Sequence, residues 1–145
     1  MIAPKKIYCI DTGIIHSVAF KFSEDFGRVM ENLVTVDLLR RASYAYESST
    51  EVYYWKDHQH HEVDFVLKKG SRVEQLIQVT AASSSDEIRE REFLSLLKAS
   101  KDLRCDSLVI ITWDYEAQET KDGQDIQFIP LWKWLLTSES PMKKG

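Results

Sequence analysis

Four polar residues stand at positions from which their side chains could meet in the folded chain: Glu31, Asp64, Gln78 and Thr80. Asp64 and Gln78 lie in separate short segments that are rich in β-branched and aromatic residues, so both segments favour strands. The residue midway between them is 71, which falls in the turn region 68–71. A tight hairpin would therefore place the two side chains opposite each other, with Cβ atoms about 4.5–5.5 Å apart.

Thr80 and Glu31 join this pair by different routes. Gln78 and Thr80 share one strand face, because successive side chains of a strand point to opposite sides. Glu31, followed by Asn32, lies off the centre of an apolar stripe in a predicted helix, from which it could point into the mouth of the sheet. A chemical site at these residues therefore requires a helix that packs beside a hairpin.

The helix that would carry Glu31 is predicted at Phe26–Ala42, where apolar residues recur at helical spacing. The polar residues 23–25 (SED) provide a capping, acidic entrance. Val34 and Leu38 widen the apolar stripe, so we expect this helix to be covered on more than one side. The three strands that follow have short connections, which predict antiparallel hairpins; they are Glu51–Lys56, Glu62–Leu67 and Arg72–Thr80.

A second helix is predicted to begin at Ser84. Ser84 and Glu87 have the spacing of a capping box, and Glu87 with Arg91 forms an i,i+4 pair. The continuous apolar run Ser107–Trp113 is typical of a strand buried on both faces. Because strand–helix–strand connections are right-handed, this strand is expected to lie parallel to the strand that precedes the helix.

The remaining segments are expected to add elements at both ends of one α/β domain that covers residues 1–145. Lys6–Ile10 reads as a short strand, and Ile14–Phe22 is ambiguous. Glu116–Gly123 is predicted to be a charged loop and Asp125–Ile129 a short strand. Pro130 is predicted to open a terminal helix. Residues 1–4 and 138–145 are expected to be loose ends.

Bulk composition narrows the class of protein. A chain of 145 residues with 43% hydrophobic and 29% charged residues fits a single globular domain. A net charge of −4 argues against a general polyanion binder, although local basic patches remain open. Cys9 and Cys105 are predicted to be reduced and buried thiols. We expect a cytoplasmic protein without a membrane partner, because no signal core or membrane-spanning apolar run occurs.

Three other groups of residues have a structural reading that we favour over a functional one. His58, His60 and His61 lie beside Asp57 and Glu62, and an exposed polar turn is favoured over a metal site, since a hairpin tip preorganises little.

Asp37 is expected to pair with Arg41 at i,i+4, in preference to joining a polar cluster around Glu31. Trp132 and Trp134 are expected to pack a terminal helix onto the sheet and not to stack on nucleobases.

Several motifs resemble a known family in order and spacing. The stretch 26–33 (FGRVMENL) looks like the GR-x-x-EN motif of a carboxy-terminal domain found in many prokaryotic, especially archaeal, AAA-family ATPases. The stretches 54–57 (YWKD), 62–66 (EVDFV) and 76–80 (LIQVT) are similar to the next motifs, and 129–136 (IPLWKWLL) resembles the ending. The resemblance covers nearly the whole chain and implies the fold of PD-(D/E)XK nucleases: a helix, three antiparallel strands, a helix and a parallel strand.

The same resemblance implies roles for the four polar residues. In PD-(D/E)XK nucleases a helical Glu, a strand Asp and a following Asp/Glu-x-Lys bind a divalent cation and align water. Glu31 and Asp64 match the first two positions, but Gln78 stands in place of the second carboxylate and Thr80 in place of the Lys. An amide lacks the charge that Mg²⁺ or Mn²⁺ prefers, and the loss of one electrostatic group typically lowers a rate about 10²–10³-fold. Arg89 or Arg91 could replace the missing Lys.

These comparisons lead to one expected function and two alternatives. We expect a catalytically degenerate, nuclease-like accessory domain that recognises nucleic acid or a partner and works with an AAA-type ATPase domain elsewhere. This chain has no GxxxxGK[ST] motif and hence no P-loop ATP site. The first alternative is an active Mg²⁺- or Mn²⁺-dependent nuclease, with Glu31, Asp64, the Gln78 amide oxygen and the Val79 carbonyl as ligands. The second is a structural module for protein interaction or homo-oligomerisation.

Overall fold

The computed structural model describes residues 2–3, 26–44 and 50–137. The predicted strand Lys6–Ile10, the ambiguous segment Ile14–Phe22, Cys9 and the expected loose ends at 1, 4 and 138–145 lie outside the described residues. Residues 2–3, which were also expected to be loose, instead form a short strand that pairs with residues 54–55. The fold is therefore built from the helices and strands of the remaining chain.

A mixed sheet of seven strands forms the centre of the molecule. Strands β1 to β4 are antiparallel neighbours, β4, β5 and β7 run parallel, and β6 returns antiparallel to β7. The spatial order is β1 (Ile2–Ala3), β2 (Thr50–Lys56), β3 (Glu62–Lys69), β4 (Arg72–Val79), β5 (Leu108–Thr112), β7 (Gln124–Pro130) and β6 (Ala117–Lys121).

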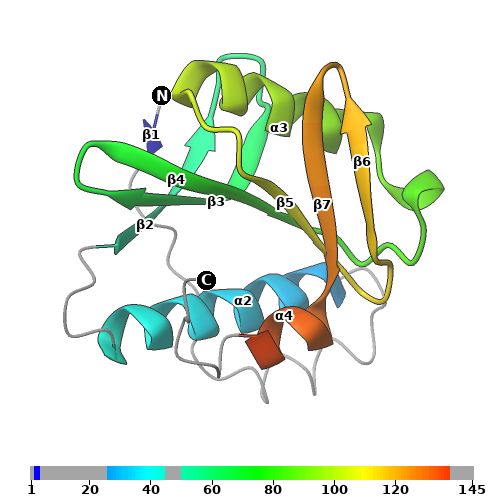
Figure 1. Cartoon of the computed structure of the whole chain (residues 1–145), viewed down its shortest axis with the longest axis horizontal. Coiled ribbons are helices and arrows are strands. Elements are labelled where there is room, and N and C mark those ends of the chain that lie inside the picture. Colours follow the sequence, from blue (N-terminus) through cyan, green and yellow to red (C-terminus); the bar gives the residue numbers. More distant parts are fainter. Residues whose placement is uncertain (1, 4–25, 45–49, 138–145) are drawn as a thin grey trace.

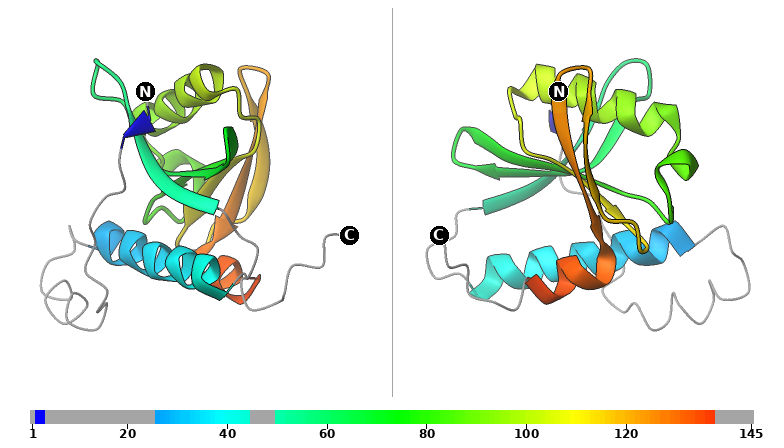
Figure 2. Two further views of the ribbon diagram at one scale, coloured as in Figure 1. Left: turned by 90° about the vertical axis from the view of Figure 1, so that its left-hand side faces the viewer. Right: turned by 45° about the vertical axis from the view of Figure 1, so that its right-hand side comes forward.

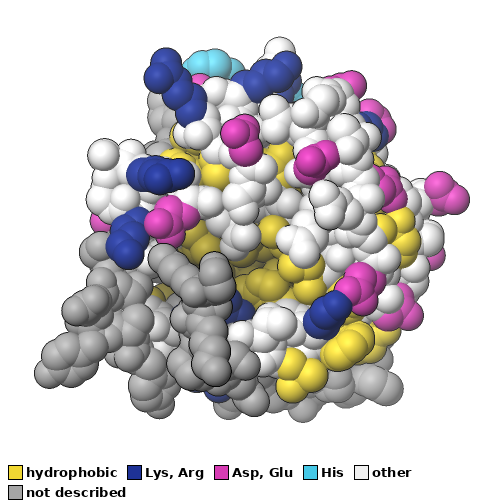
Figure 3. Space-filling model, in the orientation of Figure 1, with side chains coloured by type: hydrophobic (Ala, Val, Ile, Leu, Met, Phe, Trp, Pro, Cys, Tyr) yellow, Lys and Arg dark blue, Asp and Glu magenta, His cyan; other side chains and the backbone are white. Residues whose placement is uncertain are grey.

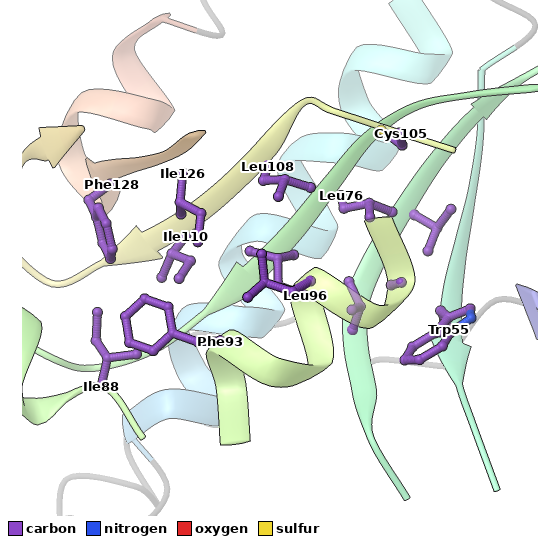
Figure 4. Packing of buried hydrophobic residues seen from close by; sticks show 14 of the residues in the cluster. Trp55, Leu76, Ile88, Phe93, Leu96, Cys105, Leu108, Ile110, Ile126 and Phe128 are labelled. Carbon is purple, nitrogen blue, oxygen red and sulfur yellow. The ribbon is translucent and has the colours of Figure 1, made fainter. Parts of the chain in front are cut away.

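Helices cover both faces of this sheet and make a three-layer α/β/α arrangement (Figures 1 and 2). Helix α3 (Glu90–Leu103) lies on one face, while α2 (Phe26–Tyr44) and α4 (Leu131–Thr137) lie on the other. Between α3 and the sheet, an apolar core includes Trp55, Phe93 and Phe128 (Figure 4). A second core joins Met30 and Val34 of α2 to the opposite face.

Most predicted elements are confirmed within one or two residues. The helix predicted at 26–42 is α2, and the three predicted hairpin strands are β2, β3 and β4. All five residues of β5 are buried, and β5 lies parallel to β4 as predicted. Helix α2 is covered on more than one side: Met30 and Val34 face the sheet, yet Asn32, about half a turn away from Met30, is only 2% exposed.

Two further local predictions are wrong. The chain around Ser84 does not begin an α-helix: a 3₁₀ turn, η2 (Ser85–Glu87), comes first, and the extended residues Ile88 and Arg89 delay α3 to Glu90. Burial of Ile88 in the core accounts for this extended step. The Glu87 carboxylate accepts a hydrogen bond from the Ser83 N–H (2.7 Å), and the Ser84 side chain makes no capping bond.

The segment predicted as a charged loop, Glu116–Gly123, contains strand β6. Asp122 and Gly123 both have positive φ angles (50° and 78°) and join β6 to β7, with Lys121 opposite Gln124. Two successive positive φ angles are characteristic of a tight two-residue hairpin turn, for which Asp-Gly is a strong sequence signal.

Among the described residues, no helix is both long and apolar enough to cross a membrane.

Candidate functional site

A β-bulge in β3 sets the geometry around Asp64. Tyr53 pairs with Val66 and Trp55 pairs with Val63, so Asp64 and Phe65 together face the single residue Tyr54. The extra residue leaves Val63 and Val66 packed in the same core, on the α3 side of the sheet. Bulges bend a strand and redirect side chains, and they are frequent beside functional sites. Asp64 therefore lies where β3 departs from regular pairing.

The side chains of Asp64 and Gln78 bridge β3 and β4 beyond the end of their ladder. The last regular β3–β4 pair is Phe65 with Ile77. Beyond it, the Asp64 N–H donates to Gln78 Oε1 (2.9 Å), Gln78 Nε2 donates to the Glu62 carbonyl (2.8 Å), and the Val79 N–H donates to Asp64 Oδ2 (2.9 Å). The predicted meeting of Asp64 and Gln78 is thus present, as a set of side-chain-to-backbone bonds that we call the β3–β4 fork.

The fork engages one carboxylate oxygen of Asp64 and both ends of the Gln78 amide. Gln78 is 5% exposed, and both ends of its amide are bound to the β3 backbone. One oxygen of Asp64 is held by the Val79 N–H. In the described part of the chain, no three His, Cys, Asp or Glu side chains gather as metal ligands do. The arrangement of Asp64 and Gln78 is that of a structural bridge between two strands.

Glu31 and Thr80 lie in different segments, and Thr80 directly follows the fork residue Val79. Glu31 is half-buried on α2, next to Met30, which packs in the same core as the fork neighbours Phe65 and Ile77. The Glu31 carbonyl accepts a hydrogen bond from Thr35 Oγ1 (2.9 Å). Thr80 directly follows β4 and is half-buried, and its N–H donates to the Ile111 carbonyl (2.9 Å). The roles predicted for Glu31, Asp64, Gln78 and Thr80 in catalysis and metal binding stay predictions.

The two arginines considered as replacements for the missing Lys lie at the start of α3. Arg91 Nη2 donates to the His60 carbonyl (2.6 Å) and so fastens the β2–β3 tip to the helix. Arg89 is the exposed N-terminal capping residue of α3. The predicted i,i+4 pair of Glu87 with Arg91 is replaced by this contact to His60.

The histidine-rich β2–β3 tip is an ordered turn organised by Asp57. The Asp57 carboxylate accepts hydrogen bonds from the Gln59 N–H (2.9 Å) and the His61 N–H (2.8 Å), and it contacts His61 Nδ1 (3.0 Å). Lys98 of α3 reaches the side chains of Gln59 and Asp57. His60 has a positive φ of 64°. These contacts account for the conspicuous sequence as a capped polar turn.

The bonds to Asp57 predict a pH-dependent contribution to stability. Burial acts to raise the pKa of Asp57, but hydrogen bonds from the backbone and ring of His61 and from Gln59 outweigh it and lower the pKa from 3.8 to about 2. A carboxyl group with a lower pKa in the folded state stabilises the fold above its unfolded pKa. This contribution should fade as the pH falls from about 4 toward about 2.

The change Asp57→Asn should therefore lower the melting temperature at neutral pH. The melting-temperature difference between wild type and Asp57→Asn should shrink as the pH falls through the same range. Thermal unfolding followed by circular dichroism at a series of pH values measures this difference. Gln59→Ala is the matched control, because its side chain lies in the same tip and does not titrate. A difference that stays constant down to the acid limit would contradict the proposed role of the Asp57 charge.

Asp37 is a buried carboxylate that pairs with two arginines of α2. It is 3% exposed and binds Arg40 Nη2 (2.6 Å) and Arg41 Nε (2.8 Å). The Arg41 guanidinium also lies over the Trp134 ring (4.1 Å to the centroid) and donates to the Trp134 carbonyl (3.2 Å). The predicted pair of Asp37 with Arg41 is confirmed, and the structure adds Arg40 and a link from α2 to α4.

Packing was also predicted for Trp132 and Trp134, and burial for Cys105. Trp134 is 5% exposed and packs α4 against the sheet as predicted. The same prediction is wrong for Trp132, which is 58% exposed, because it points away from the side of α4 that carries Trp134. Cys105 is a free, buried thiol as predicted, and burial raises its pKa.

Comparisons with known proteins identify the family. The model of the family described as "Domain of unknown function (DUF4143)" matches residues 26–134, which include the fork, the β2–β3 tip and the Asp37 pair. The chain is 35% identical over 142 residues to "Uncharacterized protein MJ1544" of Methanocaldococcus jannaschii. This alignment covers 94% of the chain and 30% of the relative, so the chain spans less than a third of the relative's length. The chain belongs to the DUF4143 family.

Proposed function

We propose that this chain is a nuclease-like accessory domain that works with an AAA-family ATPase and recognises a protein partner without cleaving nucleic acid. The order of elements supports a PD-(D/E)XK-like core: helix α2, antiparallel strands β2 to β4, helix α3 and the parallel strand β5. Asp64 lies at a bulge with Phe65, which shares a core with Met30 of α2, and this further supports the comparison.

The single observation that carries the proposal is the engagement of the Gln78 amide. Its oxygen accepts from the Asp64 N–H and its nitrogen donates to the Glu62 carbonyl, so both ends of the amide are bound to neutral backbone groups. Mg²⁺ and Mn²⁺ favour charged oxygen ligands, which an amide does not provide. At position 80, threonine lacks the positive charge of the Lys expected in a nuclease, and Arg91 is bound at the β2–β3 tip. The absence of both the second carboxylate, at position 78, and the lysine, at position 80, favours recognition over cleavage.

A protein partner fits the chain better than nucleic acid does. The net charge is −4, and affinity for nucleic acid depends on clustered Lys and Arg that displace counterions. The aligned relative is more than three times as long as the matched region, which leaves room in that protein for other domains. The sequence of this chain contains no P-loop motif, so we assign ATP binding to the AAA-family ATPase with which this chain works.

A nuclease assay tests this proposal directly. The full chain is incubated with supercoiled plasmid and with single-stranded oligonucleotides in Mg²⁺ or Mn²⁺, and calorimetry measures Mn²⁺ binding to the same sample. We expect neither cleavage nor Mn²⁺ binding in the millimolar range. Cleavage that disappears in Asp64→Ala, while Asp86→Ala keeps it, would overturn the proposal and establish the nuclease alternative.

A further inference from the structure

Exposed apolar side chains gather where the parallel strands β5 and β7 end. Trp132 and Leu136 are 58% and 59% exposed, the highest values for large apolar residues in the described ranges, and Trp113 follows at 46%. Trp132 and Leu136 are four residues apart and hence share one side of α4. Thr112 pairs with Pro130, so Trp113 and α4 leave the sheet from neighbouring strand ends.

One ion pair borders this apolar surface. The Lys133 ammonium group of α4 contacts the Glu116 carboxylate, and both side chains are about half exposed. Figure 3 shows apolar atoms over α4 beside basic and acidic side chains. We call the surface formed by Trp113, Glu116, Trp132, Lys133 and Leu136 the α4 patch.

The composition of the α4 patch is that of a protein contact. Isolated exposed apolar residues are ordinary, but large exposed apolar residues that share one side of a helix beside charged residues are typical of an interaction surface. Tryptophan is enriched among the residues that dominate binding energy at such surfaces. Stacking of nucleobases on the tryptophans is disfavoured, because the chain carries a net charge of −4.

The charges further select the kind of protein. A two-fold interface between identical chains brings the same patch together twice, so the patch must be complementary to itself. The α4 patch meets this condition: an apolar centre can meet its own copy, and Lys133 of each copy can face the partner's Glu116. A partner with charge of one sign would gain from only one of these two residues.

We propose that the α4 patch is a self-association surface through which two copies of this chain form a two-fold dimer. This inference goes beyond the proposed function, since it concerns different residues from the fork and holds whether or not the fork binds a cation. Trp132 is the central anchor, Leu136 and Trp113 extend the apolar contact, and the two charges set the register of one copy on the other.

Sedimentation velocity of the full chain over a wide concentration range tests the proposal. Wild type should pass from monomer to dimer as its concentration rises. Trp132→Glu should raise the dissociation constant by more than about tenfold, as expected for a central aromatic anchor. Leu94→Glu is the matched control: Leu94 is 41% exposed on α3, across the sheet from the patch, and this variant should associate as wild type does.

A charge-exchange experiment separates contacts between copies from contacts within one copy. Lys133→Glu and Glu116→Lys should each weaken association, because each places like charges on both faces of the dimer. An equimolar mixture of the two variants should restore it, since opposite charges then meet across the interface. Circular dichroism of each variant verifies its fold.

Three results would overturn the proposal. Wild type that stays monomeric at every concentration excludes the dimer, and a dimer that survives Trp132→Glu excludes the α4 patch as its interface. Quenching of tryptophan fluorescence by an oligonucleotide in wild type, lost in Trp132→Glu without change in the sedimentation profile, would assign the patch to nucleic acid instead.

Discussion

Replacement of Gln78 by alanine should lower the free energy of unfolding by about 3 kcal/mol. The change removes the acceptor of the Asp64 N–H and the donor to the Glu62 carbonyl at a site where Gln78 itself is 5% exposed. A buried polar group left without its bond costs about 1–3 kcal/mol, and two groups lose theirs here. Urea unfolding followed by tryptophan fluorescence measures the loss by linear extrapolation.

Gln75→Ala is the matched control for Gln78→Ala. Gln75 lies on the same strand and its side chain makes one exposed hydrogen bond to Ser107 Oγ (3.2 Å), so its loss should cost about 0.5 kcal/mol or less. The variant Gln78→Glu should also be destabilised, because a carboxylate cannot donate to the Glu62 carbonyl and lies beside Asp64. If the fork keeps a nuclease-like geometry, Mn²⁺ should raise the melting temperature of Gln78→Glu and leave wild type unchanged. A Gln78→Ala variant as stable as Gln75→Ala would contradict the structural role of the amide.

The opposition of Asp64 and Gln78 illustrates how far the sequence predicts the site. Lys69 pairs with Arg72 across the turn, and a uniform ladder from there would set Asp64 opposite Ile77. An irregularity between Leu67 and Lys68 shifts the register by one residue, so that the ladder reaches Phe65 opposite Ile77 and continues toward Asp64 and Gln78. A one-residue shift moves every side chain to the other face. The midpoint of Asp64 and Gln78, residue 71, therefore predicted the observed register, although the sequence did not reveal the irregularity at Leu67–Lys68 that produces this register.

The chemistry of the fork could not be predicted from the residue types. An amide in place of a carboxylate indicates a weaker cation site, but the sequence does not show which groups that amide binds. The regular β3–β4 ladder ends at Phe65 and Ile77, and beyond it the backbone groups of Glu62 and Asp64 bind the Gln78 amide. Where a ladder ends is a property of the folded chain and not of the residue types.

Other differences follow from tertiary contacts and from an unused local signal. Burial of Ile88 overrides the helix start predicted at Ser84. The outer strand β6 (AQETK) is polar, with alternate residues exposed, so it lacks the apolar pattern of a buried strand. Its turn at Asp122–Gly123 was available as a hairpin signal. The central strands β3, β4 and β5 were predictable from their apolar residues. Strand β5 is buried throughout and is continuously apolar, whereas β3 and β4 are buried only in part and mix apolar with polar residues.

Removal of the Asp37 carboxylate should be the second large loss of stability, about 3 kcal/mol for Asp37→Ala. The carboxylate is 3% exposed and holds Arg40 and Arg41, and Arg41 in turn stacks on Trp134. Breaking one side of a buried ion pair costs about 3–5 kcal/mol when the remaining charge stays buried. Because the two arginines are 49% and 33% exposed and regain water, we expect a value at the lower end.

The comparison with a surface ion pair isolates the effect of burial. Glu90 pairs with Lys121 at 2.9 Å, but the glutamate is 70% exposed, so Glu90→Ala should cost less than about 1 kcal/mol. Asp37→Ala should also increase the mobility of α4, because Arg41 loses the group that holds it against Trp134 and its carbonyl. Chemical denaturation gives the two free energies, and hydrogen exchange of the α4 amides reports the loosening. Equal losses for Glu90→Ala and Asp37→Ala would show that burial adds nothing to the Asp37 pair, and unchanged α4 exchange would show that Arg41 does not depend on Asp37 to join α2 to α4.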